Sequence, residues 1–113
     1  MHELGLCMDI VQCIEEAARR EGFERVHRVH LEIGAFAAVE VSALRFCYDA
    51  VTRDTVAAGS SLDIDRVAGE ARCERCGRTV ALSRLGDPCP RCDSHALRIT
   101  AGQDMRVVEL EVE

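Results

Sequence analysis

Two closely spaced cysteine pairs constrain this chain more than any other feature. "CERCG" places Cys73 and Cys76 with two residues between them, and "CPRCD" does the same for Cys89 and Cys92. Such spacing lets a tight turn aim both sulfurs at one point, and Gly77 gives the first turn its backbone freedom. Four thiolates from two such turns form the tetrahedron of a closed zinc site. The spacing therefore predicts a structural Zn(II) site rather than a catalytic one.

Three alternatives stay open for these cysteines. Iron of the rubredoxin type uses the same four sulfurs, and two disulfides would use them without any metal. His95, three residues beyond Cys92, is a further candidate ligand, although such a histidine is more often solvated or hydrogen-bonded to a ligand. The remaining three cysteines, Cys7, Cys13 and Cys47, lie in segments with a helical pattern.

Charge and hydropathy exclude several classes of protein. The formal net charge is −6 and no basic run is present, which argues against nucleic-acid binding. No stretch approaches the roughly 20 apolar residues of a membrane span. The first residues lack the basic region of a signal peptide. Together with free thiols in apolar positions, these features predict a protein of the reducing cytoplasm.

The hydrophobic periodicity predicts an α+β fold. Apolar residues recur at helical steps over 4–21 and 42–53, and alternate as in strands over 27–34, 61–67 and 105–113. The segment 70–102 is rich in Cys, Arg, Gly and Pro and shows little periodicity. We therefore expect two helices on a small three-stranded mixed sheet, with an inserted zinc-ribbon-like four-cysteine domain. The predicted domains are 1–69 with 103–113, and the insert 70–102.

The start of the chain, "MHEL", has a particular capacity for metals. The Met1 amine, the amide of residue 2 and the His2 imidazole offer three nitrogen donors, a set that suits Ni²⁺ or Cu²⁺. Glu3 and Glu40 are candidate carboxylate ligands. The simpler alternatives are a disordered terminal histidine and two carboxylates that stabilise helix N-termini.

Taken together, several segments resemble the HypA/HybF family over essentially the whole chain. These are "MHEL", "RVHLEIGAFAAVE", "ALRFCYDAVT" and the two cysteine pairs before "MRVVELEVE". Members of that family are nickel-incorporation metallochaperones for [NiFe]-hydrogenase maturation. The resemblance implies two sets of metal ligands in this chain: His2, Glu3 and Glu40 for nickel, and Cys73, Cys76, Cys89 and Cys92 for structural zinc.

The resemblance also implies partners. These are the GTPase HypB and the precursor of a hydrogenase large subunit, and in some bacteria related proteins also serve urease. The sequence contains no phosphate-binding loop and no base paired with a nucleophile, so we expect a nickel carrier and not an enzyme. Two rival classes are a zinc-ribbon regulator that binds nucleic acid and a small electron carrier with iron at the four cysteines.

Overall fold

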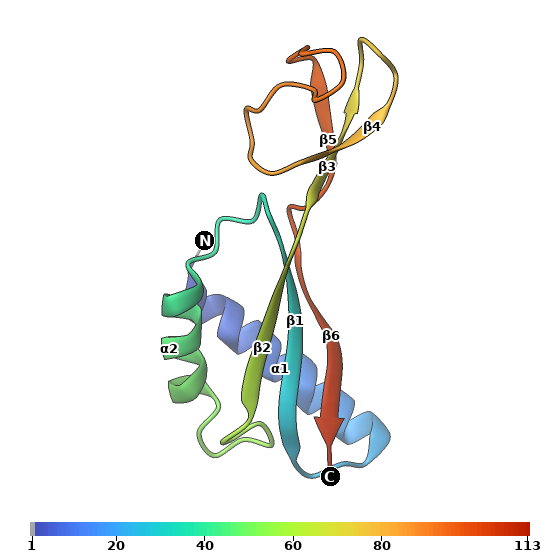
Figure 1. The fold of residues 1–113 in the computed structure, drawn as a ribbon. Coiled ribbons are helices and arrows are strands. Elements are labelled where there is room, and N and C mark those ends of the chain that lie inside the picture. Colours follow the sequence, from blue (N-terminus) through green and yellow to red (C-terminus); the bar gives the residue numbers. More distant parts are fainter. Residues whose placement is uncertain (1) are drawn as a thin grey trace. The chain divides into compact units, whose positions relative to one another are not determined.

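The computed structural model describes residues 2–113, which form two helices and six strands (Figure 1). Their order along the chain is α1 (Glu3–Glu21), β1 (Val26–Gly34), α2 (Val41–Val51), β2 (Ser61–Val67), β3 (Gly69–Cys73), β4 (Thr79–Leu82), β5 (Leu97–Ala101) and β6 (Met105–Val112). Each predicted helix and strand is present, with bounds that differ by at most two residues. Within the described residues, neither helix has the length and apolar character that crossing a membrane requires.

The chain divides into two compact units, which we describe separately. Unit 1 comprises 1–31, 38–64 and 107–113, and unit 2 comprises 32–37 and 65–106. The first sheet has the strand order β2-β1-β6. Figure 1 shows β1 and β2 running in the same direction and β6 in the opposite one, so this sheet is mixed, as predicted. The boundaries expected at 70 and 102 stay a prediction, because a compact unit is not by itself a folding unit.

The core of unit 1 lies between the helices and this sheet. Apolar residues spaced three and four apart along α1 are buried, and α1 packs against α2. Gly22 ends α1 in the left-handed conformation, where its N–H donates to the Ala18 carbonyl at 2.8 Å. Along β1, Val29 and Leu31 of unit 1 are fully buried, as is Ile33 where the strand enters unit 2, which confirms the predicted alternation.

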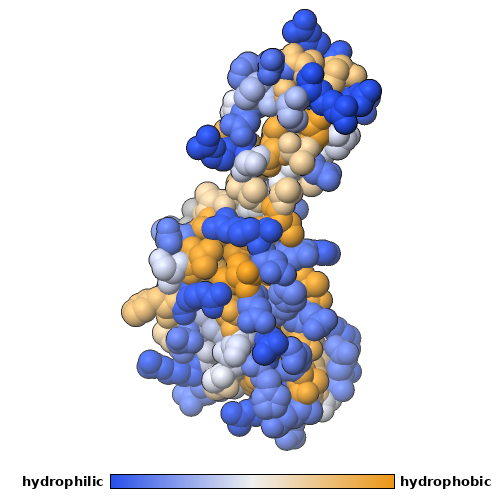
Figure 2. Space-filling view, viewed as in Figure 1, coloured by the Kyte–Doolittle hydropathy of each residue, from blue (hydrophilic) through white to orange (hydrophobic). Residues whose placement is uncertain are grey.

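The opposite face of this sheet is charged. Arg28 of β1 lies between Asp63 of β2 and Glu111 of β6, at 3.4 Å and 3.2 Å respectively. Figure 2 shows a largely hydrophilic surface over the lower parts of the three strands. The predicted alternation of β6 is interrupted, because the consecutive residues Val108 and Glu109 are both exposed. The charged face of the sheet is therefore solvated, and the core lies only on the face that packs against the helices.

Unit 2 contains a second three-stranded sheet of order β4-β3-β5, in which both pairs are antiparallel. A hairpin joins β3 to β4, with Ala71 opposite Val80. The segment that the sequence predicts as poor in apolar periodicity does have a small core. It consists of Ala71, Cys73, Val80, Leu82 and Cys89. Two of these five residues belong to the cysteine pairs, so the core and the cysteine cluster are built together.

Phe36 belongs to this small core although it lies far from the insert in sequence. Its ring packs against the buried cluster of unit 2, directly over Gly69. A Cβ atom at Gly69 would lie 2.1 Å from the ring, and one at Gly102 would lie 2.5 Å from the Gly69 Cα. Both glycines are therefore required by the close approach of neighbouring groups, and at Gly102 also by a φ of +102°.

Candidate metal centres

The two cysteine pairs form two similar turns. In the first, the Gly77 N–H donates to the Cys73 carbonyl at 2.8 Å, and Gly77 has the positive φ that the sequence predicts. In the second, the Asp93 N–H donates to the Cys89 carbonyl at 2.8 Å, and Asp93 takes the same conformation with φ 61°. Asp is one of the few residues with a side chain that tolerates this region. Both turns direct their sulfurs inward.

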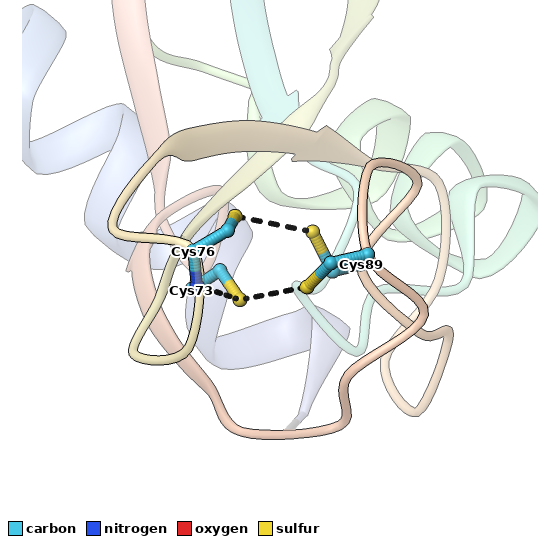
Figure 3. A group of neighbouring side chains, drawn as sticks. Cys73, Cys76 and Cys89 are labelled. Carbon is cyan, nitrogen blue, oxygen red and sulfur yellow. Dashed lines mark hydrogen bonds between the residues drawn. The ribbon is translucent and has the colours of Figure 1, made fainter.

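Figure 3 shows these sulfurs turned toward one another from opposing loops. The Cys73 and Cys92 sulfurs are 3.6 Å apart, and those of Cys76 and Cys89 are 3.9 Å apart. All four sulfurs lie within 4.8 Å of one another. A tetrahedron with Zn–S bonds of about 2.3 Å has edges of about 3.8 Å. The sulfurs therefore stand where four ligands of one zinc ion would stand.

Backbone N–H groups point at the sulfurs and change their chemistry. The Cys76 N–H donates to the Cys73 sulfur at 3.4 Å, and the Arg91 N–H donates to the Cys89 sulfur at the same distance. The first of these hydrogen bonds is the main cause that lowers the pKa of Cys73 to about 6. Thiolate, the form that binds metals, is therefore favoured at Cys73.

Cys92 shows the opposite behaviour. The Ser94 backbone lowers its pKa through a hydrogen bond, but burial and the neighbouring thiols outweigh this and raise the pKa to about 11. Negative charge at one sulfur thus opposes charge at the next. A cation at the centre would remove this opposition. The four sulfurs therefore suit a divalent metal ion. Without a metal, some of the four thiols keep their protons.

The histidine considered as an alternative ligand does not join this cluster. His95 is exposed, and the cluster that the structure brings together contains only the four cysteines. Among residues 2–113, these cysteines are also the one group of three or more His, Cys, Asp or Glu side chains placed closely enough to hold a metal ion.

At the other candidate centre, the structure brings Glu3 and Glu40 together. Glu3 is the first residue of α1, and Glu40 immediately precedes α2. The Glu40 backbone N–H donates to the Glu3 carboxylate at 3.1 Å. This hydrogen bond is the main cause that lowers the pKa of Glu3, and nearby His2 lowers it further. Two acidic residues that are distant in sequence thus meet where α1 begins.

Glu40 is also the N-cap of α2, as one alternative from the sequence predicts. Its carboxylate accepts hydrogen bonds from the Ser42 N–H at 3.2 Å and from the Ser42 hydroxyl at 2.7 Å. Sequence reasoning missed Ser42, which donates to the Glu40 carboxylate from the first turn of α2. Ser42 fixes the orientation of the Glu40 side chain, and so belongs to this centre.

His2 is the N-cap of α1, and its side chain is exposed and makes no capping hydrogen bond. Its carbonyl accepts the Leu6 N–H at 3.1 Å, which starts the helical ladder. The amide of His2 itself precedes that ladder and has no place in it. The Met1 amine, the other predicted nitrogen donor, lies outside the described residues.

Comparisons with known proteins give a consistent result. A family model described as hydrogenase/urease nickel incorporation metallochaperone HypA matches residues 1–112. The chain is 50% identical to the hydrogenase maturation factor HypA of Acidithiobacillus ferrooxidans and 49% identical to that of Azotobacter vinelandii, over the full length of each protein.

Solved structures agree with this result. The solution structure of the Ni metallochaperone HypA from Helicobacter pylori matches with a TM-score of 0.73 and 25% identity. The match covers 99% of this chain and 97% of the other. A family match over nearly the whole chain, close relatives of equal length and the shared fold support one conclusion. This chain belongs to the HypA family of nickel-incorporation metallochaperones for hydrogenase maturation.

Proposed function

We propose that this chain binds Ni(II) where α1 begins, through His2 with Glu3 and Glu40, and delivers it for the maturation of [NiFe]-hydrogenase. The observation that carries this proposal is the hydrogen bond from the Glu40 N–H to the Glu3 carboxylate. It brings the second acidic residue to the helix start that His2 caps.

The donor set is compatible with nickel as the cargo, and the family description supports nickel over copper. Imidazole and amide nitrogens are strong-field donors that suit Ni²⁺ in preference to Mg²⁺ or Ca²⁺. His2 is exposed and lies at the end of a helix, so an incoming ligand from a receiving protein can reach the metal. A site with few protein ligands releases its ion by ligand exchange more readily than a closed cage does. Moderate affinity is what a carrier needs.

We propose further that Cys73, Cys76, Cys89 and Cys92 hold a structural Zn(II). The distances between their sulfurs support this, and the small core around Ala71 supports a role in folding unit 2. Bound zinc supplies folding free energy and leaves no open coordination position for catalysis. Iron in the same site would give a strong visible absorption, which zinc does not. A colourless purified protein with one zinc per chain is the expected result.

The proposed partners are the GTPase HypB and the precursor of a hydrogenase large subunit, in the cytoplasm, and urease is a further candidate receiver. The name of the A. ferrooxidans relative, a hydrogenase maturation factor, supports the hydrogenase role. The family is one of metallochaperones and not of enzymes, which also disfavours the nucleic-acid-binding and electron-carrier alternatives. Transfer of ⁶³Ni from this protein to the purified precursor, with and without the GTPase, tests the partner proposal.

The test of the nickel site is a calorimetric titration of zinc-loaded protein with Ni(II). His2→Ala should abolish tight binding and leave the zinc content unchanged. His27→Ala is the matched control, because His27 is another exposed histidine and pairs with Glu113 in unit 1. It should bind nickel like the wild type. Equal nickel affinity in the wild type and both variants would exclude His2 as a ligand.

A second comparison decides which nitrogens take part. If the Met1 amine is a ligand, acetylating it or extending it by a few residues should weaken nickel binding and shift the visible d–d bands. Identical affinity and spectra would exclude the amine and leave the amides and His2 as donors. In either case binding should weaken on acidification, because protons compete with the metal for the imidazole.

A further inference from the structure

Two cysteines that the metal centres do not use lie on the two packed helices of unit 1, Cys7 on α1 and Cys47 on α2. Cys7 of α1 is fully buried, and its thiol donates to the Leu44 carbonyl of α2 at 3.3 Å. Cys47 lies three residues after Leu44 on the same helix and is half-buried. The Cys7 thiol therefore contacts the turn of α2 that precedes Cys47.

Helix geometry places the Cys47 side chain over this carbonyl. Side chains on an α-helix point back toward its N-terminus, so a residue covers the turn that precedes it. Positions three apart are neighbours on the helix surface, with roughly 5–6 Å between their Cβ atoms. Cys47 therefore stands beside Leu44, where the Cys7 thiol already makes contact. The pKa of Cys7 agrees with this placement, because Cys47 is one of the groups that raise it.

We propose that Cys7 and Cys47 form an oxidation site for hydroperoxides, which closes an intramolecular disulfide between α1 and α2. The half-buried Cys47 reacts first: its sulfur takes one oxygen from hydrogen peroxide to become a sulfenic acid, and water leaves. The Cys7 sulfur then attacks the Cys47 sulfur, the S–O bond of the sulfenic acid breaks, and the leaving hydroxide takes the Cys7 thiol proton to depart as the second water. One peroxide and two thiols thus give one disulfide and two waters.

The order of the two steps follows from the surroundings of Cys7. Burial is the main cause that raises its pKa to about 11, and Cys47 and Glu3 raise it further. At neutral pH, Cys7 is therefore a neutral thiol without access to solvent, which reacts poorly with peroxide. It serves as the resolving partner, because the sulfenic acid is formed next to it. This inference does not depend on the nickel proposal.

Cys13 provides a matched control within α1. It lies six residues after Cys7 and is exposed, so it is accessible to peroxide but turned away from α2. We expect it to form mixed or intermolecular disulfides and no link to Cys47. Replacing Cys13 also makes the disulfide easier to assign, because trypsin leaves Cys7 and Cys13 together in one peptide, 1–19.

The experiment uses zinc-loaded Cys13→Ala protein, treated with a small excess of hydrogen peroxide at neutral pH. Free thiols are alkylated in denaturant, and the chain is digested without reductant. The expected product is peptide 1–19 joined to peptide 46–53, at a mass two hydrogens below the sum of the two. The link should be absent from Cys47→Ala, in which Cys7 should stay reduced. The oxidised form should melt at a higher temperature, and reductant should reverse the change.

Three results would overturn the proposal. Cys47 could proceed to the sulfinic acid with no link to Cys7. The link could form equally in folded protein and in protein unfolded in guanidinium, which would show that the fold does not direct it. Finally, Cys7 could oxidise as fast in Cys47→Ala as in the parent, which would refute its role as the resolving thiol.

Discussion

The contact between Phe36 and Gly69 leads to a prediction about stability. The effect of Gly69→Ala on the free energy of unfolding should change sign when the Phe36 ring is removed. Gly69→Ala places a methyl group 2.1 Å from the Phe36 ring, far inside van der Waals contact. The three atoms nearest to that methyl group all belong to this ring. Gly69 does not have a positive φ, so the backbone accepts alanine there. The closest conflict is therefore with the ring.

The magnitudes follow from these contacts. Overpacking by Gly69→Ala should lower the free energy of unfolding of unit 2 by about 3 kcal/mol. Phe36→Ala should lower it by about 2 kcal/mol, because the ring is half-buried. In the Phe36→Ala background, Gly69→Ala should instead raise stability by about 0.5 kcal/mol, since alanine loses less backbone entropy in a strand. The coupling free energy is then about 3.5 kcal/mol.

Hydrogen exchange of the β3 amides in the zinc-loaded proteins measures these free energies within unit 2 itself. Gly102→Ala is the control. Its Cβ would lie 3.2 Å from the Phe36 ring, but its φ of +102° and its approach of 2.5 Å to the Gly69 Cα remain without the ring. It should therefore destabilise both backgrounds. An equal cost of Gly69→Ala with and without the Phe36 ring would refute the reasoning.

Three further predictions concern the cysteines and the start of α1. Cys73→Ala should lose zinc and the exchange protection of β4 (Thr79–Leu82), while the far-ultraviolet helical signal of unit 1 persists; retained β4 protection would argue against folding by zinc. Because the pKa of Cys7 is raised from 9.0 to about 11, its burial stabilises the fold fully below pH 9, and about 2 kcal/mol should be lost as pH rises toward 11. Urea unfolding at pH 8 and pH 11 should show this loss in the wild type and less of it in Cys7→Ala. The lowered pKa of Glu3 has the opposite sign: the Glu40 contact stabilises above the unfolded pKa of Glu3 and is lost as pH falls through the folded value. An NMR titration of Glu3 should show a pKa that rises toward its ordinary value when Glu40→Pro removes the N–H donor, which is the main cause of the lowered pKa.

Much of the fold follows from local patterns in the sequence. The helix α1 ends at Glu21 because Gly22 supplies the left-handed cap, and β1 alternates because one face is buried against helices. The four cysteines converge because each pair forms its own turn. All of these features depend on residues within a few positions of one another, and for that reason the sequence alone is sufficient to predict them.

Contacts between distant segments were not predictable in the same way. Phe36 reads as part of a short connector, and only the fold places its ring against Gly69. The hydrogen bond between Glu40 and Glu3 joins two helix starts that are 37 residues apart. The second sheet was missed because β3, β4 and β5 contain only four or five residues each, too few for periodicity to stand out. Long-range packing decides each of these features.

The two carboxylates where α1 begins have a consequence for how cargo is handed over. Each has a hydrogen-bond donor from its own chain within reach, the Glu40 N–H for Glu3 and Ser42 for Glu40. If these carboxylates hold nickel as proposed, an oxygen that releases the ion regains a hydrogen-bond partner that is already in place, so less reorganisation of solvent is needed. A receiving site then needs a smaller advantage in affinity to take the ion, and the receiver sets the direction of transfer.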